Sequence, residues 1–327
     1  DVVTMNAQWR VNKLYIQYNM NGGSLLDTHG SYIGNSGEFI TNNGSINVNS
    51  YSYGGSLPNG GLPDWNNPKS INIGKVGYTA LDGGEWNTKS DGTGKSYSDD
   101  IVYALSDFAD LSDGDKTITL YVNWKPNTYS ISYQSNGGNG TTTTSSHIYD
   151  TAKALTSNGF SRLGYSFTGW NTKADGSGTV YSNSQSVKNL TSVNGETVTL
   201  YAQWALVNYT ISYNLNGGSV SENPTSYNIE TAAFTLKNPT KTGYTFKGWT
   251  GSNGDSVQTS VTISSGSTGN KSYVANWEAN TYTYDIVYKS SSGKSLGTST
   301  VSGEHGSSKV VTAPSKDGYT TPSSQTD

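Results

Sequence analysis

The sequence predicts a mostly β protein built of small modules in tandem, arranged as an elongated array. Short segments alternate apolar and polar residues, and three sequence landmarks recur in a fixed order. Charged residues make up only 13% of the chain, but aromatic residues make up 12%. Disordered segments are poor in aromatic residues, so this composition favours small β domains that fold around a few large rings.

The first landmark is an alternating strand followed by Asn-Gly-Gly, and it predicts a half-buried strand and a turn. Alternate side chains of a strand face opposite sides of a sheet, so Tyr129, Ile131 and Tyr133 share one face. Asn-Gly-Gly tolerates positive φ, which a tight hairpin turn requires. The same pattern recurs in "LYIQYNMNGG" (14–23), "YSISYQSNGG" (129–138) and "YTISYNLNGG" (209–218), and without the glycines at Tyr284, Ile286 and Tyr288.

The second and third landmarks are a Gly-Trp segment and a closing strand that ends in tryptophan. We interpret the tryptophans as structural core because they recur with the same flanking Tyr and Phe, and a small domain gains much buried area from one indole. A carbohydrate-stacking platform at Trp170 and Trp249 is the less favoured alternative. The predicted core tryptophans are Trp124, Trp170, Trp204, Trp249 and Trp277, with Trp170 paired to Trp204 and Trp249 to Trp277.

The spacing of the landmarks divides the chain into modules. Residues 1–9 are expected to be the last strand of a preceding module, so the sequence is expected to be a piece of a longer array. The module at 10–125 carries an insertion at about 30–75. Joints are expected near 125–128, 205–208 and 278–281. The remaining segments are the modules 126–205 and 206–278 and a partial, divergent module at 279–327.

These landmarks together resemble the Listeria–Bacteroides repeat family, the internalin-type B repeats of bacterial surface proteins. The matching text is "PTKTGYTFKGW" (239–249), "GWNTKADGSGTVY" (169–181) and "VTLYAQW" (198–204). The resemblance implies β-grasp-like modules, with α+β character if a minor helix is present, between a wall anchor and a distal functional domain. It also implies an extracellular location at a bacterial cell surface. The segment 279–327 is weakly similar to a mucin-binding-protein domain, and a degenerate B repeat is the alternative.

Composition and motifs argue against several classes of function. A net charge of −4 argues against a nucleic-acid binder, which usually carries a basic patch. The chain has no cysteine and therefore no disulfide or thiolate site, and it has no apolar run of the roughly 18 residues that a membrane span needs. We expect no enzyme: no catalytic residue, no cofactor and no metal.

Three kinds of fragment invite a chemical interpretation, and each has a plainer one. "DGTGKS" (91–96) looks like the end of a phosphate-binding loop, but Lys89 stands where the motif needs glycine, so a surface turn is predicted. "DLSDGD" (110–115) fails the calcium-loop pattern. We interpret His29, His147 and His305 as exposed loop histidines.

The insertion at 30–75 and Lys271 each allow a second interpretation. The insertion at 30–75 carries the candidate partner-binding residues Tyr32, Tyr51, Tyr53 and Trp65. We expect an elaborated hairpin that covers the module's own core, and ligand contact is the alternative. Lys271 stands where sister strands carry Val198 or Ile118. We expect a lysine whose ammonium reaches solvent, and an isopeptide crosslink is the alternative.

The favoured function is a structural stalk or fibre that spaces an adhesive tip from the cell. The alternative is an adhesin module that recognises a glycan, a mucin or a host protein through the 30–75 insertion. The expected partners are accordingly other modules of the chain or neighbouring copies in a fibre, or a glycan or host protein, with no nucleic acid.

Overall fold

The structure is a computed structural model that describes residues 13–25, 41–42, 45–46, 49–52, 73–81, 86–98, 107–109 and 116–326. These residues form β-strands and no α-helix. The mostly β class is therefore confirmed, whereas the β-grasp topology stays a prediction. The chain divides into two compact units, residues 1–160 with 168–203 and residues 161–167 with 204–327. The predicted module bounds also stay a prediction.

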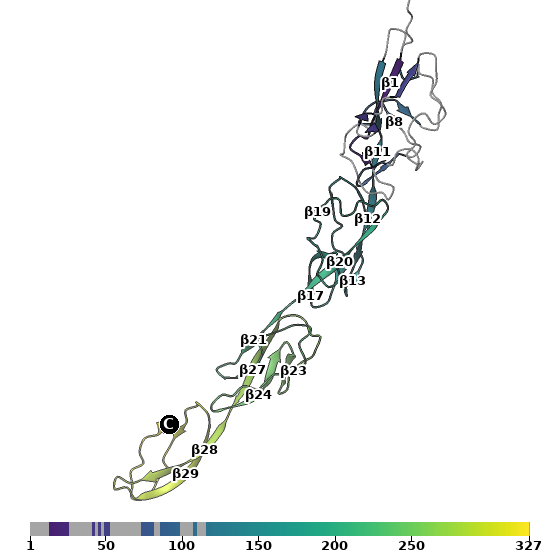
Figure 1. Cartoon of the computed structure of the whole chain (residues 1–327). Coiled ribbons are helices and arrows are strands. Elements are labelled where there is room, and N and C mark those ends of the chain that lie inside the picture. The colour runs from purple at the N-terminus through teal and green to yellow at the C-terminus, as the bar shows by residue number, and fades with distance from the viewer. Residues whose placement is uncertain are drawn as a thin grey trace, which may run out of the picture. The chain divides into compact units, whose positions relative to one another are not determined.

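One five-stranded sheet shows the architecture most completely, and Figure 1 labels its strands β12, β17 and β20. The order of the sheet is β14-β12-β20-β17-β18. The central pair is parallel, with Ile131 opposite Val198 and Tyr133 opposite Leu200. The strands are β12 (Thr128–Gln134), β14 (Ser145–Ile148), β17 (Tyr165–Asn171), β18 (Val180–Tyr181) and β20 (Thr197–Leu206).

Two further sheets repeat this order with a parallel central pair. The first is β5-β1-β10-β8-β9, with β1 (Lys13–Asn19), β5 (Asn49–Ser52), β8 (Trp86–Asn87), β9 (Ser96–Tyr97) and β10 (Lys116–Val122). The other is β22-β21-β27-β24-β25, with β21 (Tyr209–Asn214), β22 (Ser226–Tyr227), β24 (Tyr244–Gly251), β25 (Gly254–Gln258) and β27 (Lys271–Ala279).

Short paired strands accompany each sheet. Among the described residues they pair as β2 (Ser24–Leu25) with β6 (Ile73–Gly74), β3 (Thr41–Asn42) with β4 (Ser45–Ile46), β7 (Tyr78–Ala80) with β11 (Trp124–Pro126), β13 (Asn139–Gly140) with β16 (Phe160–Ser161), β15 (Lys153–Ala154) with β19 (Ser186–Val187), β23 (Phe234–Thr235) with β26 (Thr262–Ile263), and β30 (Val310–Val311) with β31 (Gln325–Thr326).

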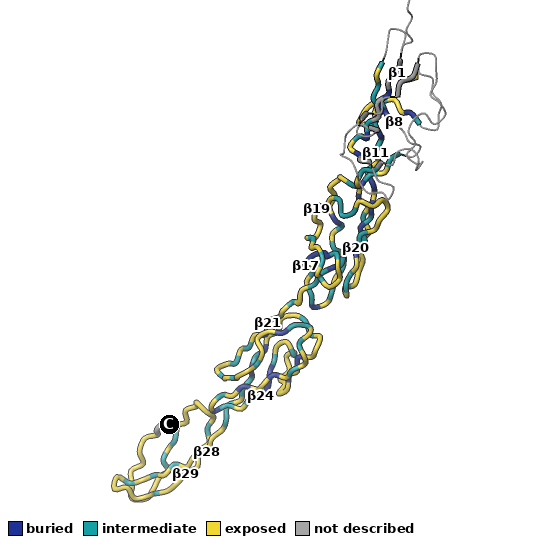
Figure 2. The backbone as a smooth tube through the Cα atoms, viewed as in Figure 1, coloured by how far each residue is buried: buried dark blue, intermediate teal, exposed yellow. Residues whose placement is uncertain are grey.

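The predicted alternation of buried and exposed side chains is clearest in β12. Tyr129, Ile131 and Tyr133 are buried, whereas Thr128 and Gln134 at the two ends of the strand are exposed. Figure 2 shows buried residues along the strands around β20 and β24. In the sheet that contains β21, the core is Ile211, Tyr227, Leu236, Trp249, Val261, Ile263, Tyr273 and Ala275.

The C-terminal hairpin departs from the predicted half-buried strand. β28 (Thr281–Lys289) pairs antiparallel with β29 (Ser295–Glu304). Its residues are exposed or only half-buried. Within the described part of the chain β28 has one neighbouring strand, whereas β12 lies between two, so less of β28 is covered.

The Asn-Gly-Gly turns differ from the predicted hairpin. Asn136 and Gly137 have φ of 48° and 89°, so the expected positive φ is present. However, β12 pairs with β14 and β20, and β13, the strand after the turn, pairs with β16. The turn therefore does not close a tight hairpin: the chain first passes through β13 and only then returns along β12 as its antiparallel neighbour β14.

Candidate functional site

The predicted partner-binding residues lie mostly outside the described residues. This applies to Tyr32, Tyr53 and Trp65. Tyr51 lies in β5 opposite Leu14, although its side chain is not described. The same register position holds His147 opposite Tyr129 and Tyr227 opposite Tyr209, and both are buried. Tyr51 therefore occupies a position that two other sheets use for core side chains.

The loop that resembled a phosphate-binding fragment is organised by a buried asparagine. Asn87 is 0% exposed. Its side-chain oxygen accepts hydrogen bonds from the N–H groups of Lys89 (2.9 Å) and Gly94 (3.0 Å), and its amide donates to Gly92 O and Gly94 O (both 3.1 Å). These N–H groups are already satisfied, so they do not form an anion cradle. The predicted surface turn accounts for the loop.

Asn171 builds the same loop in the next sheet. It is 1% exposed, accepts from Lys173 N (2.8 Å) and Gly178 N (3.0 Å), and donates to Gly176 O (3.0 Å) and Gly178 O (3.3 Å). Sequence reasoning missed the role of both asparagines. The signal was Trp-Asn-Thr-Lys at 86–89 and again at 170–173, ahead of an Asp-Gly turn.

The Asn-Gly-Gly turn is hydrogen-bonded to the closing strand and packs against its tryptophan. Asn216 Nδ2 donates to Ala275 O at 2.9 Å, and Trp277 Nε1 donates to Leu215 O at 3.0 Å. A β-carbon on Gly218 would lie 2.4 Å from the Trp277 ring, so the second glycine provides the space in which the indole packs. Asn21, Gly23 and Trp124 repeat the arrangement, and Asn136 Nδ2 donates to Ala202 O at 2.9 Å.

The tryptophans fall into two classes. Trp86, Trp170 and Trp249, on the strands next to the closing strand, are each 0% exposed. Trp124, Trp204 and Trp277, at or near the end of the closing strand, are half-buried. Phe246 lies 5.4 Å from both Trp249 and Trp277, measured between ring centroids, so it connects that predicted pair. In the preceding repeat, Phe167 lies 5.8 Å from Trp204.

His147 is a correction to the sequence analysis. It was predicted to be an exposed loop histidine, but it lies in β14 and is 0% exposed. The ring stacks on Tyr129 with centroids 5.4 Å apart, and Nε2 lies 2.9 Å from Ser145 Oγ. Burial lowers the pKa of His147, and the positive charge of Lys153 lowers it further. The histidine is therefore a neutral core residue.

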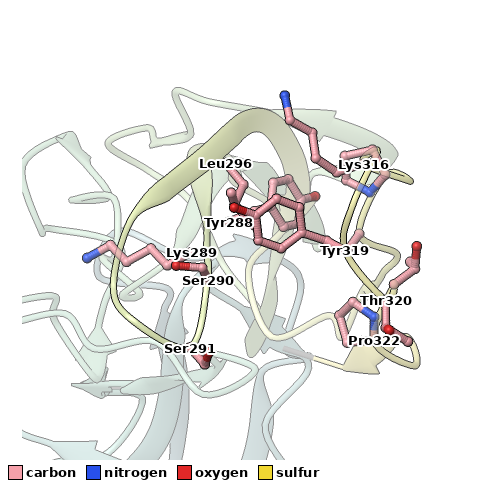
Figure 3. A pocket seen from close by; sticks show the side chains of 12 residues that line it. Tyr288, Lys289, Ser290, Ser291, Leu296, Lys316, Tyr319, Thr320 and Pro322 are labelled. Carbon is pink, nitrogen blue, oxygen red and sulfur yellow. The ribbon is translucent and has the colours of Figure 1, made fainter.

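A cavity of about 420 Å³ lies beside the C-terminal hairpin, as Figure 3 shows. Tyr288 and Leu296 line it from β28 and β29, and Tyr319 and Pro322 from the segment that follows. Tyr288 corresponds to Tyr133 and Tyr213, whose rings pack against Trp170 and Trp249. Tyr288 thus lines a cavity, whereas its two counterparts pack against a tryptophan.

We also searched the described residues for candidate metal sites and for membrane-spanning helices. They contain no group of three His, Cys, Asp or Glu side chains able to hold a metal ion. The described part of the chain also has no helix that is long and apolar enough to cross a membrane.

The sequence matches a known family over two segments, 129–203 and 209–276, each of which matches the family model of the Listeria-Bacteroides repeat domain. The resemblance is confirmed for these segments. Such repeats are typical of bacterial surface proteins, consistent with a location in the cell envelope.

Two proteins of Evansella cellulosilytica are similar to the chain. One is provisionally named a Gly-rich membrane protein and is 33% identical over 255 residues, covering 76% of this chain and 27% of that protein. The other is provisionally named a membrane protein and is 31% identical over 160 residues, covering 47% of this chain and 21% of that protein. The chain thus spans about a quarter of the length of these relatives.

Proposed function

We propose that this chain, with Listeria-Bacteroides repeat domains at 129–203 and 209–276, is a structural spacer of a bacterial surface protein. It would hold a distal, adhesive part of that protein away from the cell. The observation that carries the proposal is the repeated sheet: three sheets share one strand order and one parallel central pair.

Each sheet has a core of its own, which supports a string of separate domains. Trp86, Trp170 and Trp249 occupy corresponding places and are all fully buried. Solenoid repeats share a continuous core with their neighbours, whereas Trp170 and Trp249 pack against Tyr133 and Tyr213 of their own sheets. Length can then be set by the number of repeats without redesign of any one of them.

Short connectors support an extended array. Only Asn127 lies between β11 and β12, and only Asn280 lies between β27 and β28. Val207 and Asn208 separate β20 from β21. Such connectors are too short to act as flexible linkers.

The described polar groups support a structural role over a chemical one. The loop most similar to a phosphate site is filled by Asn87 and Asn171, which use their hydrogen bonds within the loop. Ligand binding through the 30–75 insertion remains the alternative function.

Small-angle scattering of the chain tests the spacer. A compact single domain of this length has a radius of gyration of about 20 Å, and a spacer should clearly exceed that value. A radius near 20 Å would contradict the proposal.

Deletion of 30–75 tests the alternative. A spacer should bind glycan arrays and host cells only at background, with or without the insertion. Binding that disappears on deletion would favour the adhesin.

A further inference from the structure

One turn is built three times with the same geometry. A basic residue, any residue, glycine and tyrosine follow in order, and the tyrosine N–H donates to the carbonyl of the basic residue at 3.0 to 3.1 Å. The glycine φ is 75° to 77°, and the basic group lies 3.8 to 4.3 Å from the centroid of the tyrosine ring. The three joint turns are Lys75–Tyr78, Arg162–Tyr165 and Lys241–Tyr244.

Each joint turn hydrogen-bonds the connector, and at two of the three the connector also bonds the following repeat. Gly243 O accepts from Asn280 N at 2.9 Å, and Asn280 O accepts from His305 N at 2.8 Å. The Asn280 side chain accepts from Thr245 Oγ1 at 2.6 Å. Asn127 makes the corresponding contacts with Gly77, Tyr149 and Thr79 at 2.8, 2.8 and 2.6 Å. At the middle turn, Val207 N donates to Gly164 O at 3.0 Å.

A side chain of the following repeat occupies the space over each glycine. A β-carbon on Gly77 would lie 2.2 Å from the Tyr149 ring, and one on Gly243 would lie 2.2 Å from the His305 ring. At Gly164 the neighbour is Ile229, at 2.6 Å. We call Tyr149, Ile229 and His305 the docked side chains.

The tyrosine of the joint turn also contacts the following repeat. Tyr78 meets Tyr149 edge to face at 5.8 Å, and Tyr244 meets His305 at 5.6 Å. The Tyr78 hydroxyl donates to Asp150, and the Tyr165 hydroxyl donates to Glu230. These acids immediately follow the docked side chains Tyr149 and Ile229.

A fourth copy of the turn shows that it forms without docking. Tyr319 N donates to Lys316 O at 3.0 Å, and Gly318 has φ of 84°. The described part of the chain places no atom within 4 Å of a β-carbon built on Gly318. A docked side chain is therefore not required for the turn to adopt this geometry.

The division into compact units agrees with contact at the middle turn. Residues 161–167, which contain the turn Arg162–Tyr165, group with residues 204–327 and not with the rest of β17. The same unit includes residues 204–206 at the end of β20, so the ends of both strands group with the repeat that follows.

We propose that the joint turn is a docking surface for the next repeat of the same chain. The glycine leaves space for the docked side chain, its carbonyl holds the connector, and the tyrosine covers the contact. The plainer alternative is that the glycine serves only the positive φ of the turn.

Hydrogen exchange on the whole chain with Gly243→Ala tests the proposal. The added methyl collides with His305, so the amides at 280 and 305 should exchange at least tenfold faster than in the wild type. The core amide of Tyr273 should change by less than twofold. Gly318→Ala has the same backbone strain without a docked side chain, and it should leave the amides at 280 and 305 unchanged.

A double-mutant cycle separates collision from backbone strain. His305→Ala alone should also expose the two amides, and adding Gly243→Ala should then have little further effect, because the colliding ring is gone. The proposal is overturned if Gly243→Ala changes these amides by less than twofold or if the two substitutions are additive. If Gly243→Ala also speeds exchange of the Tyr273 amide, that variant has disturbed the core. The result for the amides at 280 and 305 in His305→Ala alone then decides whether the proposal holds.

Discussion

Asn171→Ala should destabilise one repeat selectively, because a single buried amide organises the loop between β17 and β18. The side chain makes four hydrogen bonds of 2.8 to 3.3 Å within the loop. At about 1 kcal/mol net for each bond, and less for the longest, the loss is about 3 kcal/mol. The substitution also leaves backbone groups of the loop without their partner.

Hydrogen exchange of the intact chain measures this loss repeat by repeat. About 3 kcal/mol corresponds to roughly a hundredfold faster exchange for protected amides such as those of Thr172 and Thr179. The repeat at 209–276 should keep its protection, because the substitution lies in another repeat. In the repeat at 209–276, Thr250 follows the buried tryptophan, so no asparagine stands at the corresponding position. Asn139→Ala, on an exposed asparagine, is the matched control.

Two results would refute this reasoning. A loss below about 1 kcal/mol would mean that the turn at Asp175 holds the loop without the amide; Asp175 already accepts from Ser177 N and Oγ. Equal loss of protection in β21 and β27 would mean that the two repeats unfold together.

Three further predictions concern the core and the closing strand. Trp170→Ala should destabilise its repeat by about 3–5 kcal/mol, more than Trp204→Ala does, because Trp170 is fully buried and Trp204 is half-buried. In both variants, hydrogen exchange should show that 209–276 keeps its own unfolding transition. Unfolding of both repeats together would contradict separate cores. Because burial holds the His147 pKa below its usual value, the unfolded chain takes up the proton first as pH falls; stability should be fully present above about pH 6.5 and should fall below it by at most about 1.4 kcal/mol per pH unit. His147→Tyr, which copies Tyr227, should flatten this dependence in urea titrations at several pH values. Lys271 Nζ lies 5.8 Å from the Tyr227 ring centroid, so we expect an intact mass equal to the sequence mass, and a loss of ammonia would reveal the crosslink.

Local patterns were enough to predict the first strand and the closing strand of each repeat, but not the shorter strands such as β14. Alternation in β12 identified the buried face, because burial depends on which side of a strand a residue lies. The tryptophan near the end of each closing strand identified β20 and β27. Trp170 and Trp249 were also predicted to be core residues, because each recurs after glycine with the same flanking Tyr and Phe, whereas the equally buried Trp86, which follows Glu85, was not predicted.

Partners distant in sequence were not predictable. The parallel pairing of β12 with β20 depends on the whole chain between them. The packing of Trp277 over Gly218 depends in the same way on the chain between those two residues. His147 looked polar and exposed because its neighbours Ser145 and Ser146 are polar; its burial follows from the register with Tyr129. The asparagine loops could be seen in the sequence as a repeated Trp-Asn-Thr-Lys motif. The role of the asparagine could not, because it depends on hydrogen bonds to backbone groups whose positions no residue type reveals.

The parallel central pair has a consequence under tension. In the sheet that contains β12 and β20, the chain enters through β12 and leaves through β20, and the two strands are neighbours that run in the same direction. Opposed forces on the two ends therefore pull these strands past each other along their length. Ladder hydrogen bonds lie across the strands, so the bonds from Ser130–Thr197 to Gln134–Tyr201 share the load in shear and must break together, whereas a hairpin pulled from its open end separates one bond at a time.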